Sequence, residues 1–146
     1  MPPMGRSEHS VSVAAAIVNP DGRIFLIRRA DTGSWEPPGG ILERDESILE
    51  GLRREVREET GFEIIPGPLT GVYKNMTLGV VALFFRAEYL SGEFSPKQES
   101  LEGEWLAPNS ATDRMSPVFA IRVTDALQGG IPAVRIHDGR CLLAEG

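Results

Sequence analysis

The sequence predicts an α/β fold in which a mixed β-sheet is covered by helices on both faces. Segments with the apolar content of strands stand on both sides of a helical segment at 47–60, and a second helical segment follows at 116–129. Residues 80–85 are almost continuously apolar, which is typical of a central strand buried on both faces. The 146 residues suit one domain, 1–146, with residues 1–9 as a flexible lead-in.

The first strands are predicted from apolar runs and from the turn between them. Residues 11–18 and 23–29 are rich in apolar and β-branched side chains, and the turn sequence Asn-Pro-Asp-Gly separates them. We expect a hairpin here. Pro37 and Pro38 then remove two backbone donors from the segment 35–40, so we expect an edge strand or an extended approach there.

The helix that follows has recognisable signals at both ends. Ser47 and Glu50 have the spacing of a capping box, and Asp45 is an alternative cap. Gly61 can adopt the left-handed conformation that ends a helix.

The rest of the chain alternates strands and loops before the late helix. A strand beginning at Phe62 is expected to be interrupted by Pro66-Gly67-Pro68. Further along we expect strands at 69–74, 78–90 and 104–107, a polar loop at 94–102, the helix at 116–129 and a terminal hairpin at 131–136 and 140–143.

Three carboxylates of the first helix point to a function. Glu55, Glu58 and Glu59 are spaced i, i+3 and i+4, so they fall within an arc of about 100°. Such a run is commonly a solvated helix face. Here, however, Glu55 and Glu59 border the apolar stripe that contains Leu52 and Val56, where burial disfavours charge. A bound hard cation such as Mg²⁺ would explain carboxylates in that position.

These glutamates belong to a longer pattern of fixed residues. Gly40 and Glu46 precede the run Arg54-Glu55-Val56-Arg57-Glu58-Glu59-Thr60-Gly61-Phe62, with five and seven residues between the three parts. This pattern resembles the Nudix box with every fixed position filled, and Trp35, Pro38 and Gly39 extend the resemblance. It implies an α/β/α sandwich with the box as a loop–helix–loop, and a hydrolase that uses Mg²⁺ or Mn²⁺ to cleave a nucleoside diphosphate linked to another group.

The resemblance also implies roles for individual residues. Glu58 and Glu59 would be metal ligands, Glu55 a ligand or a partner in water activation, and the Gly39 carbonyl a further ligand. Arg54 would orient Glu55 and balance its charge.

A general base outside the box is frequent in the resembled family, before a strand that carries an aromatic residue such as Trp105. Glu99 and Glu102 precede Trp105 by six and three residues. We favour Glu99, as base and metal ligand. The alternative is that both are exposed loop acids.

The substrate is less well defined by the sequence. Trp35 and Phe85 are candidates to stack on a base, although each is at least as compatible with a core position. Residues 77–80 lack the proline or tyrosine that resembled subfamilies carry in that region. Nucleoside triphosphates and nucleotide sugars are therefore favoured. The rival function is a Nudix-fold nucleotide-binding or sensor domain without turnover, but such domains typically lose a box glutamate.

Composition limits the partners and the compartment. The net charge of −6 and the absence of a Lys/Arg cluster argue against duplex nucleic acid as a partner. Cys141 is the only cysteine, so no intrachain disulfide can form and a cytoplasmic location is expected. No long apolar segment indicates a membrane span. The family resemblance also allows a homodimer.

Overall fold

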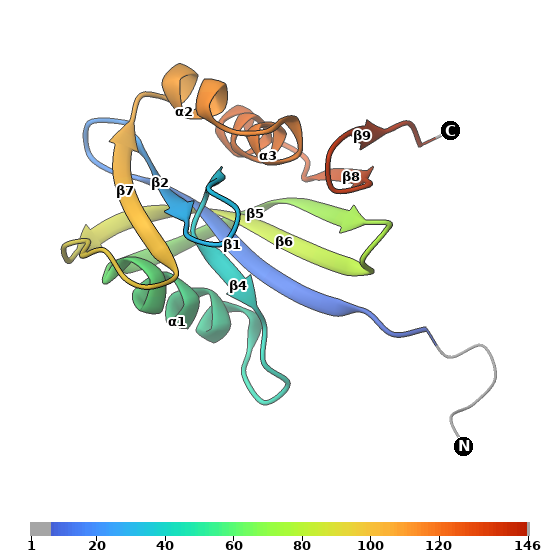
Figure 1. Cartoon of the computed structure of the whole chain (residues 1–146), viewed down its shortest axis with the longest axis horizontal. Helices are drawn as coiled ribbons and strands as arrows, with labels where there is room; N and C mark the ends of the chain where they lie inside the picture. Colours follow the sequence, from blue (N-terminus) through green and yellow to red (C-terminus); the bar gives the residue numbers. More distant parts are fainter. Residues whose placement is uncertain (1–6, 146) are drawn as a thin grey trace.

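The structure, a computed structural model, describes residues 7–145 and contains in that range one nine-stranded mixed sheet. The strand order is β3-β2-β1-β6-β5-β8-β9, and in addition β4 pairs with β1 and β7 with β2 (Figure 1). The strands are β1 (Ser10–Val18), β2 (Ile24–Arg29), β3 (Trp35–Glu36), β4 (Gly39–Ile41), β5 (Glu63–Asn75), β6 (Val80–Ser91), β7 (Ser100–Leu106), β8 (Ala133–His137) and β9 (Leu142–Leu143).

Helices cover both faces of this sheet, which confirms the predicted sandwich. The helix α1 (Ile48–Thr60) lies on one face, and α2 (Pro108–Arg114) and α3 (Pro117–Gln128) lie on the other (Figure 1). The strand β6 runs between β1 and β5, parallel to the first and antiparallel to the second, so the predicted central strand is also confirmed.

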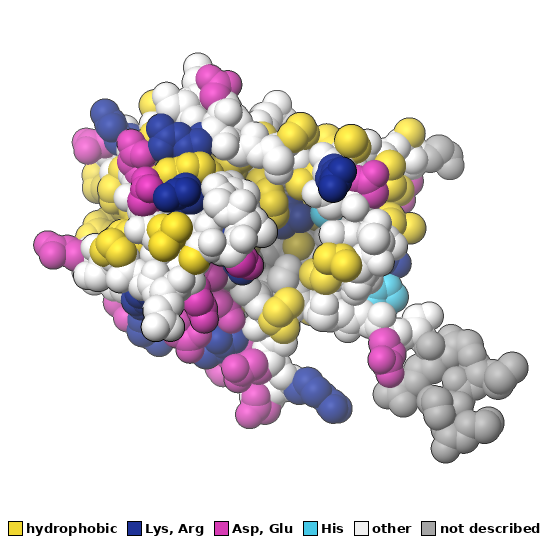
Figure 2. Space-filling view, in the orientation of Figure 1, with side chains coloured by type: hydrophobic (Ala, Val, Ile, Leu, Met, Phe, Trp, Pro, Cys, Tyr) yellow, Lys and Arg dark blue, Asp and Glu magenta, His cyan; other side chains and the backbone are white. Residues whose placement is uncertain are grey.

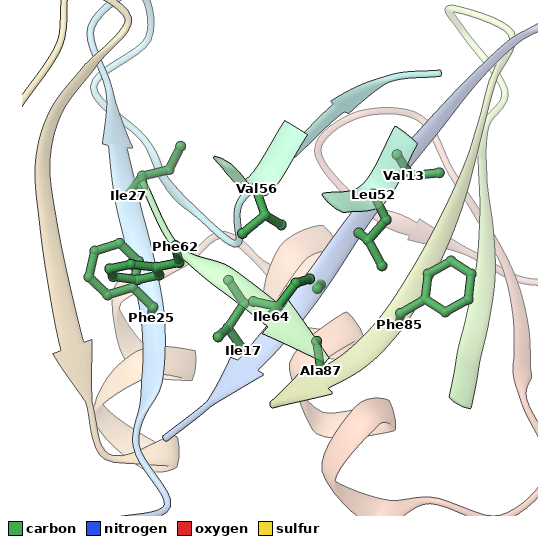
Figure 3. Close-up of a cluster of buried hydrophobic side chains, with 11 residues drawn as sticks. Val13, Ile17, Phe25, Ile27, Leu52, Val56, Phe62, Ile64, Phe85 and Ala87 are labelled. Carbon is green, nitrogen blue, oxygen red and sulfur yellow. The ribbon is translucent and has the colours of Figure 1, made fainter. Parts of the chain in front are cut away.

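Two hydrophobic clusters hold the layers together, because the side chains of a strand alternate between the two faces of the sheet. Figure 3 shows the α1-side cluster, which is made of Val13, Ala15, Ile17, Phe25, Ile27, Leu52, Val56, Phe62, Ile64, Phe85 and Ala87. The α3-side cluster is made of Ala16, Ile24, Leu26, Tyr73, Ala82, Phe84, Leu106, Ala111, Met115, Val123 and Ala126.

The ends of α1 follow the predicted signals. The Ser47 hydroxyl accepts a hydrogen bond from the Glu50 N–H at 3.2 Å, so Ser47 rather than Asp45 is the cap. At the other end Gly61 has a φ of 79°, and its N–H donates to the Arg57 carbonyl. Both caps are local, which is why short-range sequence reasoning found them.

The structure differs from the predicted elements where strand pairing overrides local signals. The strands β1 and β2 form the expected antiparallel connection but pair only at Val18 and Ile24, because β2 turns away to pair with β3 and β7. The prediction that Pro66-Gly67-Pro68 interrupts a strand is wrong. The strand β5 continues through this segment, and a register shift against β6 between Pro66 and Leu69 accommodates it.

Three other differences concern the second half of the chain. The strand β7 begins at Ser100, earlier than predicted, so Glu102 lies in a strand and not in a loop. The short helix α2 was not predicted, whereas α3 and the terminal hairpin of β8 and β9 are confirmed. The expected lead-in falls largely outside the described residues, and Ser7–His9 are exposed and precede β1.

Within residues 7–145, no helix combines the length and the apolar character that crossing a membrane requires.

Candidate active site

Arg54 is the centre of an ion-pair network on α1. Its Nη1 donates to Glu55 Oε1 at 3.0 Å and to Glu58 Oε2 at 3.1 Å. Its Nε and Nη2 donate to the two carboxylate oxygens of Glu46, at 2.9 and 2.7 Å, and Nη2 also reaches the Ile41 carbonyl. The Arg54 guanidinium therefore joins α1 to the loop before it, and it holds the pKa of Glu46 down at about 2. Figure 2 shows acidic and basic side chains gathered over this part of the surface.

Glu59 occupies a more buried position on the same helix. Its Oε2 accepts a long hydrogen bond, 3.4 Å, from the Gly39 N–H. Burial raises the pKa of Glu59 to about 8, with the charge of Glu55 acting in the same direction. Burial also raises the pKa of Glu55, although its bond to Arg54 opposes this. Both carboxylates are thus placed where a nearby cation would favour their ionised form.

The strand β4 brings the box glycines against these carboxylates. A Cβ added to Gly40 would lie 2.3 Å from Glu55 Oε2, so only glycine leaves room for that side chain. Carboxylate and backbone oxygens are the ligands that hard divalent cations prefer. The carboxylates of α1 and the backbone of β4 therefore provide the types of ligand that such an ion needs. In the part of the chain that the structure describes, no three acidic, histidine or cysteine side chains are already gathered as ligands. Arg54 holds Glu55 and Glu58, so these carboxylates would have to turn toward the ion.

The two candidate bases before Trp105 have different surroundings. Glu99 directly precedes β7, and its side chain is exposed. Glu102 lies within β7 and accepts hydrogen bonds from Arg28 Nε and Nη2 at 3.1 and 2.9 Å. Lys97 Nζ donates to the Glu58 carbonyl, which ties the segment before Glu99 to α1. The structure thus brings the chain around Glu99 to the box helix and leaves its carboxylate unpaired within residues 7–145.

A cleft opens between α3 and the sheet, beside the box glycines. It consists of two adjoining cavities of about 140 and 370 Å³, which we call the α3 cleft. The smaller cavity is lined by Gly39 and Gly40, so the α3 cleft meets the metal-site candidates. Both cavities share Ser12, Arg29, Glu36, Phe119 and Arg122.

The two residues predicted to stack on a base do not line this cleft. Phe85 is 7% exposed and belongs to the α1-side cluster, whereas its neighbour Phe84 lines the smaller cavity. Trp35 packs against the α3-side cluster, and the Arg114 guanidinium lies 4.8 Å from its ring centroid. Phe84 is itself fully buried, so Phe119, which is half-buried and lines both cavities, is the aromatic residue placed to contact a base in the α3 cleft.

Sequence reasoning missed most of the polar lining of the cleft. Arg29, Glu36 and His137 come from separate strands and carry no local pattern. Arg122 did have a signal, because it lies four residues after Val118 and four before Ala126, on the buried face of α3. A charged residue at such a position needs a partner or a ligand.

Comparison with known proteins identifies the family and the fold. A family model described as NUDIX domain matches residues 8–127. A MutT-like protein of Streptomyces ambofaciens is 51% identical over 138 residues, covering 94% of this chain and 90% of the relative. A crystal structure of a MutT protein from Methanosarcina mazei Go1 has a TM-score of 0.72 at 29% identity, covering 82% of this chain and 94% of that one. A Nudix hydrolase from Nitrosomonas europaea shares the fold, with a TM-score of 0.77 at 22% identity over 90% of this chain and 81% of that one. The chain therefore belongs to the NUDIX domain family, the Nudix hydrolases.

Proposed function

We propose that this Nudix hydrolase cleaves the pyrophosphate linkage of a nucleoside triphosphate or a nucleotide sugar in a reaction that depends on Mg²⁺ or Mn²⁺. The observation that carries the proposal is the position of Glu55 and Glu59. Both lie against the glycines of β4, at the point where the α3 cleft begins. A nucleoside in the cleft would have its phosphates directed toward these carboxylates.

The metal would be held by oxygen atoms from three segments of the chain. The proposed ligands are the carboxylates of Glu55, Glu58, Glu59 and Glu99 and the carbonyl of Gly39. Bound divalent cations neutralise phosphate oxygens and lower the pKa of a water molecule. The Glu58 carboxylate would have to leave its bond to Arg54 to bind the ion, and it has room to turn because its side chain is 60% exposed.

The remaining chemistry belongs to side chains that move a proton or position another group. Glu99 is the proposed general base, because its carboxylate is exposed beside the box helix. Glu55 is the alternative base. Arg54 would position Glu55, and when the acids bind a cation its charge still compensates Glu46.

The test is metal-dependent phosphate release from a panel of nucleoside triphosphates, nucleotide sugars, dinucleoside polyphosphates and ADP-ribose. A coupled phosphatase reveals products that retain their phosphate. We expect turnover of one class, lost on removal of the metal and in Glu58→Gln, whose fold should remain intact because the side chain is exposed.

The matched control is Glu63→Gln, which removes a glutamate that pairs with Arg57 at the protein surface and should leave turnover unchanged. Full activity of Glu58→Gln would exclude Glu58 as a ligand. Binding of a panel compound without any turnover would instead favour a nucleotide sensor.

A further inference from the structure

A buried cation in the α3 cleft has no acceptor for part of its guanidinium. Arg122 is only 8% exposed, and its Nε has no hydrogen-bond partner. No carboxylate of residues 7–145 forms an ion pair with it, and its guanidinium instead lies 5.0 Å from each of the ring centroids of Tyr73 and Phe119. Burial lowers the pKa of Arg122 to about 10, although the charge of Glu36, which lines the same cleft without forming an ion pair with Arg122, acts in the opposite direction. Such a donor is costly to bury unless something accepts its hydrogen bonds.

The neighbouring histidine adds a second donor to the same place. The Gly139 N–H donates to His137 Nδ1 at 2.9 Å, while Arg122 Nη2 lies 3.2 Å from Nε2. A neutral imidazole accepts at one nitrogen only, and an arginine accepts nothing. Burial and the charge of Arg122 lower the pKa of His137, so the ring is neutral near pH 7. If Nδ1 accepts from Gly139, the Nε2 proton faces Arg122, and two donors oppose each other.

Both side chains line the larger cavity of the cleft, together with the apolar Leu78, Val118 and Phe119. We propose that Arg122 and His137 bind the base of the substrate and select bases that present a carbonyl oxygen over bases that present an amino group. The proposal rests on the proposed function, since it names the substrate class of the same site.

The chemistry of the base edges explains the expected selection. Guanine and hypoxanthine present O6 and N7, two adjacent acceptors that match the fork of an arginine. Adenine presents an amino group in place of O6, which would add a third donor to the cluster. Likewise, uracil presents a carbonyl oxygen at position 4, where cytosine presents an amino group. A site whose buried donors are left unpaired by the wrong base discriminates strongly against it.

The experiment compares substrates that differ only in this group: inosine triphosphate with ATP, and UTP with CTP. We expect kcat/KM to favour the carbonyl member of at least one pair by about 10-fold or more. The pair that shows the preference identifies the ring class. In Arg122→Met the preference should fall to within about 3-fold, while the melting temperature is measured to confirm folding.

The control variant is Arg114→Met, which removes an arginine stacked on Trp35 outside the cleft and should leave the preference unchanged. An equal loss of kcat/KM for all substrates in Arg122→Met would indicate a phosphate contact and overturn the proposal. A preference retained in Arg122→Met would overturn it as well.

A binding measurement separates this inference from the proposed function. Calorimetry with Glu58→Gln compares inosine diphosphate with ADP, and UDP with CDP, in the absence of turnover. Tighter binding of the carbonyl member of either pair, lost in Glu58→Gln/Arg122→Met, supports the inference even if no substrate is cleaved. Equal turnover within both pairs overturns the base selection and leaves the hydrolase proposal standing. Failure of the protein to bind any of the four diphosphates also overturns the base selection.

Discussion

At the scale of single residues, Glu99 and Glu102 differ in whether another side chain already binds their carboxylates. Glu102 is paired with Arg28, whereas the Glu99 carboxylate has no partner among residues 7–145. A general base has to be available to a water molecule, so the two acids should respond differently to the loss of charge.

We predict that Glu99→Gln lowers kcat by about 10²- to 10⁴-fold, the usual contribution of a general base. Glu102→Gln is the control and should stay near the wild-type rate, because it loses only an exposed ion pair. Steady-state kinetics at saturating metal measures both. An unchanged rate in Glu99→Gln would transfer the role to Glu55 or Glu102.

At the scale of elements, β4 packs closely against two other elements through consecutive glycines. Gly39 lies against β1, and Gly40 lies against a side chain of α1. A Cβ on Gly39 would lie 2.3 Å from the backbone carbonyl oxygen of Val13, whereas one on Gly40 would meet the end of the Glu55 side chain. A backbone contact cannot yield without moving β1, but a carboxylate can turn away.

Gly39→Ala should therefore lower the free energy of unfolding by about 2 kcal/mol or more. Gly40→Ala should keep most of the stability but lower kcat at least about 10-fold, because Glu55 is displaced. Urea unfolding and steady-state kinetics on both variants test the contrast. Equal effects of the two substitutions on both measurements would contradict it.

The helix α3 is tied to the sheet by Asp125. Its carboxylate accepts from the Tyr73 hydroxyl at 2.7 Å and from Arg135 Nε and Nη2, each at 2.8 Å. Burial works against ionisation of Asp125, but the bonds from Arg135 and Tyr73 outweigh it and hold its pKa below the ordinary value of 3.8. The folded state thus favours the ionised carboxylate.

Because the folded pKa lies below the unfolded one, this contribution to stability is complete above pH 3.8 and is lost as the pH falls through the folded value. We predict that Asp125→Asn costs about 2 kcal/mol at pH 7 and progressively less below pH 3.8. Urea unfolding of both proteins from pH 7 to pH 2.5 measures the difference. A difference that does not shrink in acid would show that the charge of Asp125 is not responsible.

At the scale of the whole molecule, the two hydrophobic clusters share strands and should unfold together. The strand β1 contributes Val13 to the α1-side cluster and Ala16 to the α3-side cluster. Each cluster also has its own tryptophan packed against it, Trp105 on the α1 side and Trp35 on the α3 side. The protein therefore contains a fluorescent reporter for each face.

Leu52→Ala in the α1-side cluster should cost about 2–5 kcal/mol. We predict that it shifts the unfolding midpoint equally in the single-tryptophan backgrounds Trp35→Phe and Trp105→Phe, because a strand shared by two cores couples them. Fluorescence-monitored urea unfolding tests this. A midpoint of Trp35 that does not move would mean that the faces unfold independently.

What could be predicted from the sequence was encoded over short distances along the chain. The caps Ser47 and Gly61 act within one helical turn, and the spacing of Glu55, Glu58 and Glu59 defines a helix face without reference to the rest of the molecule. The apolar run of β6 likewise predicted a central strand, because the signal lies within one short stretch of the chain. The helix, its acidic face and the family were therefore determined by the sequence itself.

The tertiary structure alone decided which side chains meet in the α3 cleft. A strand buried on both faces has no polar face to mark its orientation, so the sequence could not tell that Phe84 faces the cleft and Phe85 the opposite core. Arg122 and His137 come from α3 and β8, and only the packing of α3 on the sheet brings them together. Contacts between distant segments depend on this packing, which local periodicity does not encode.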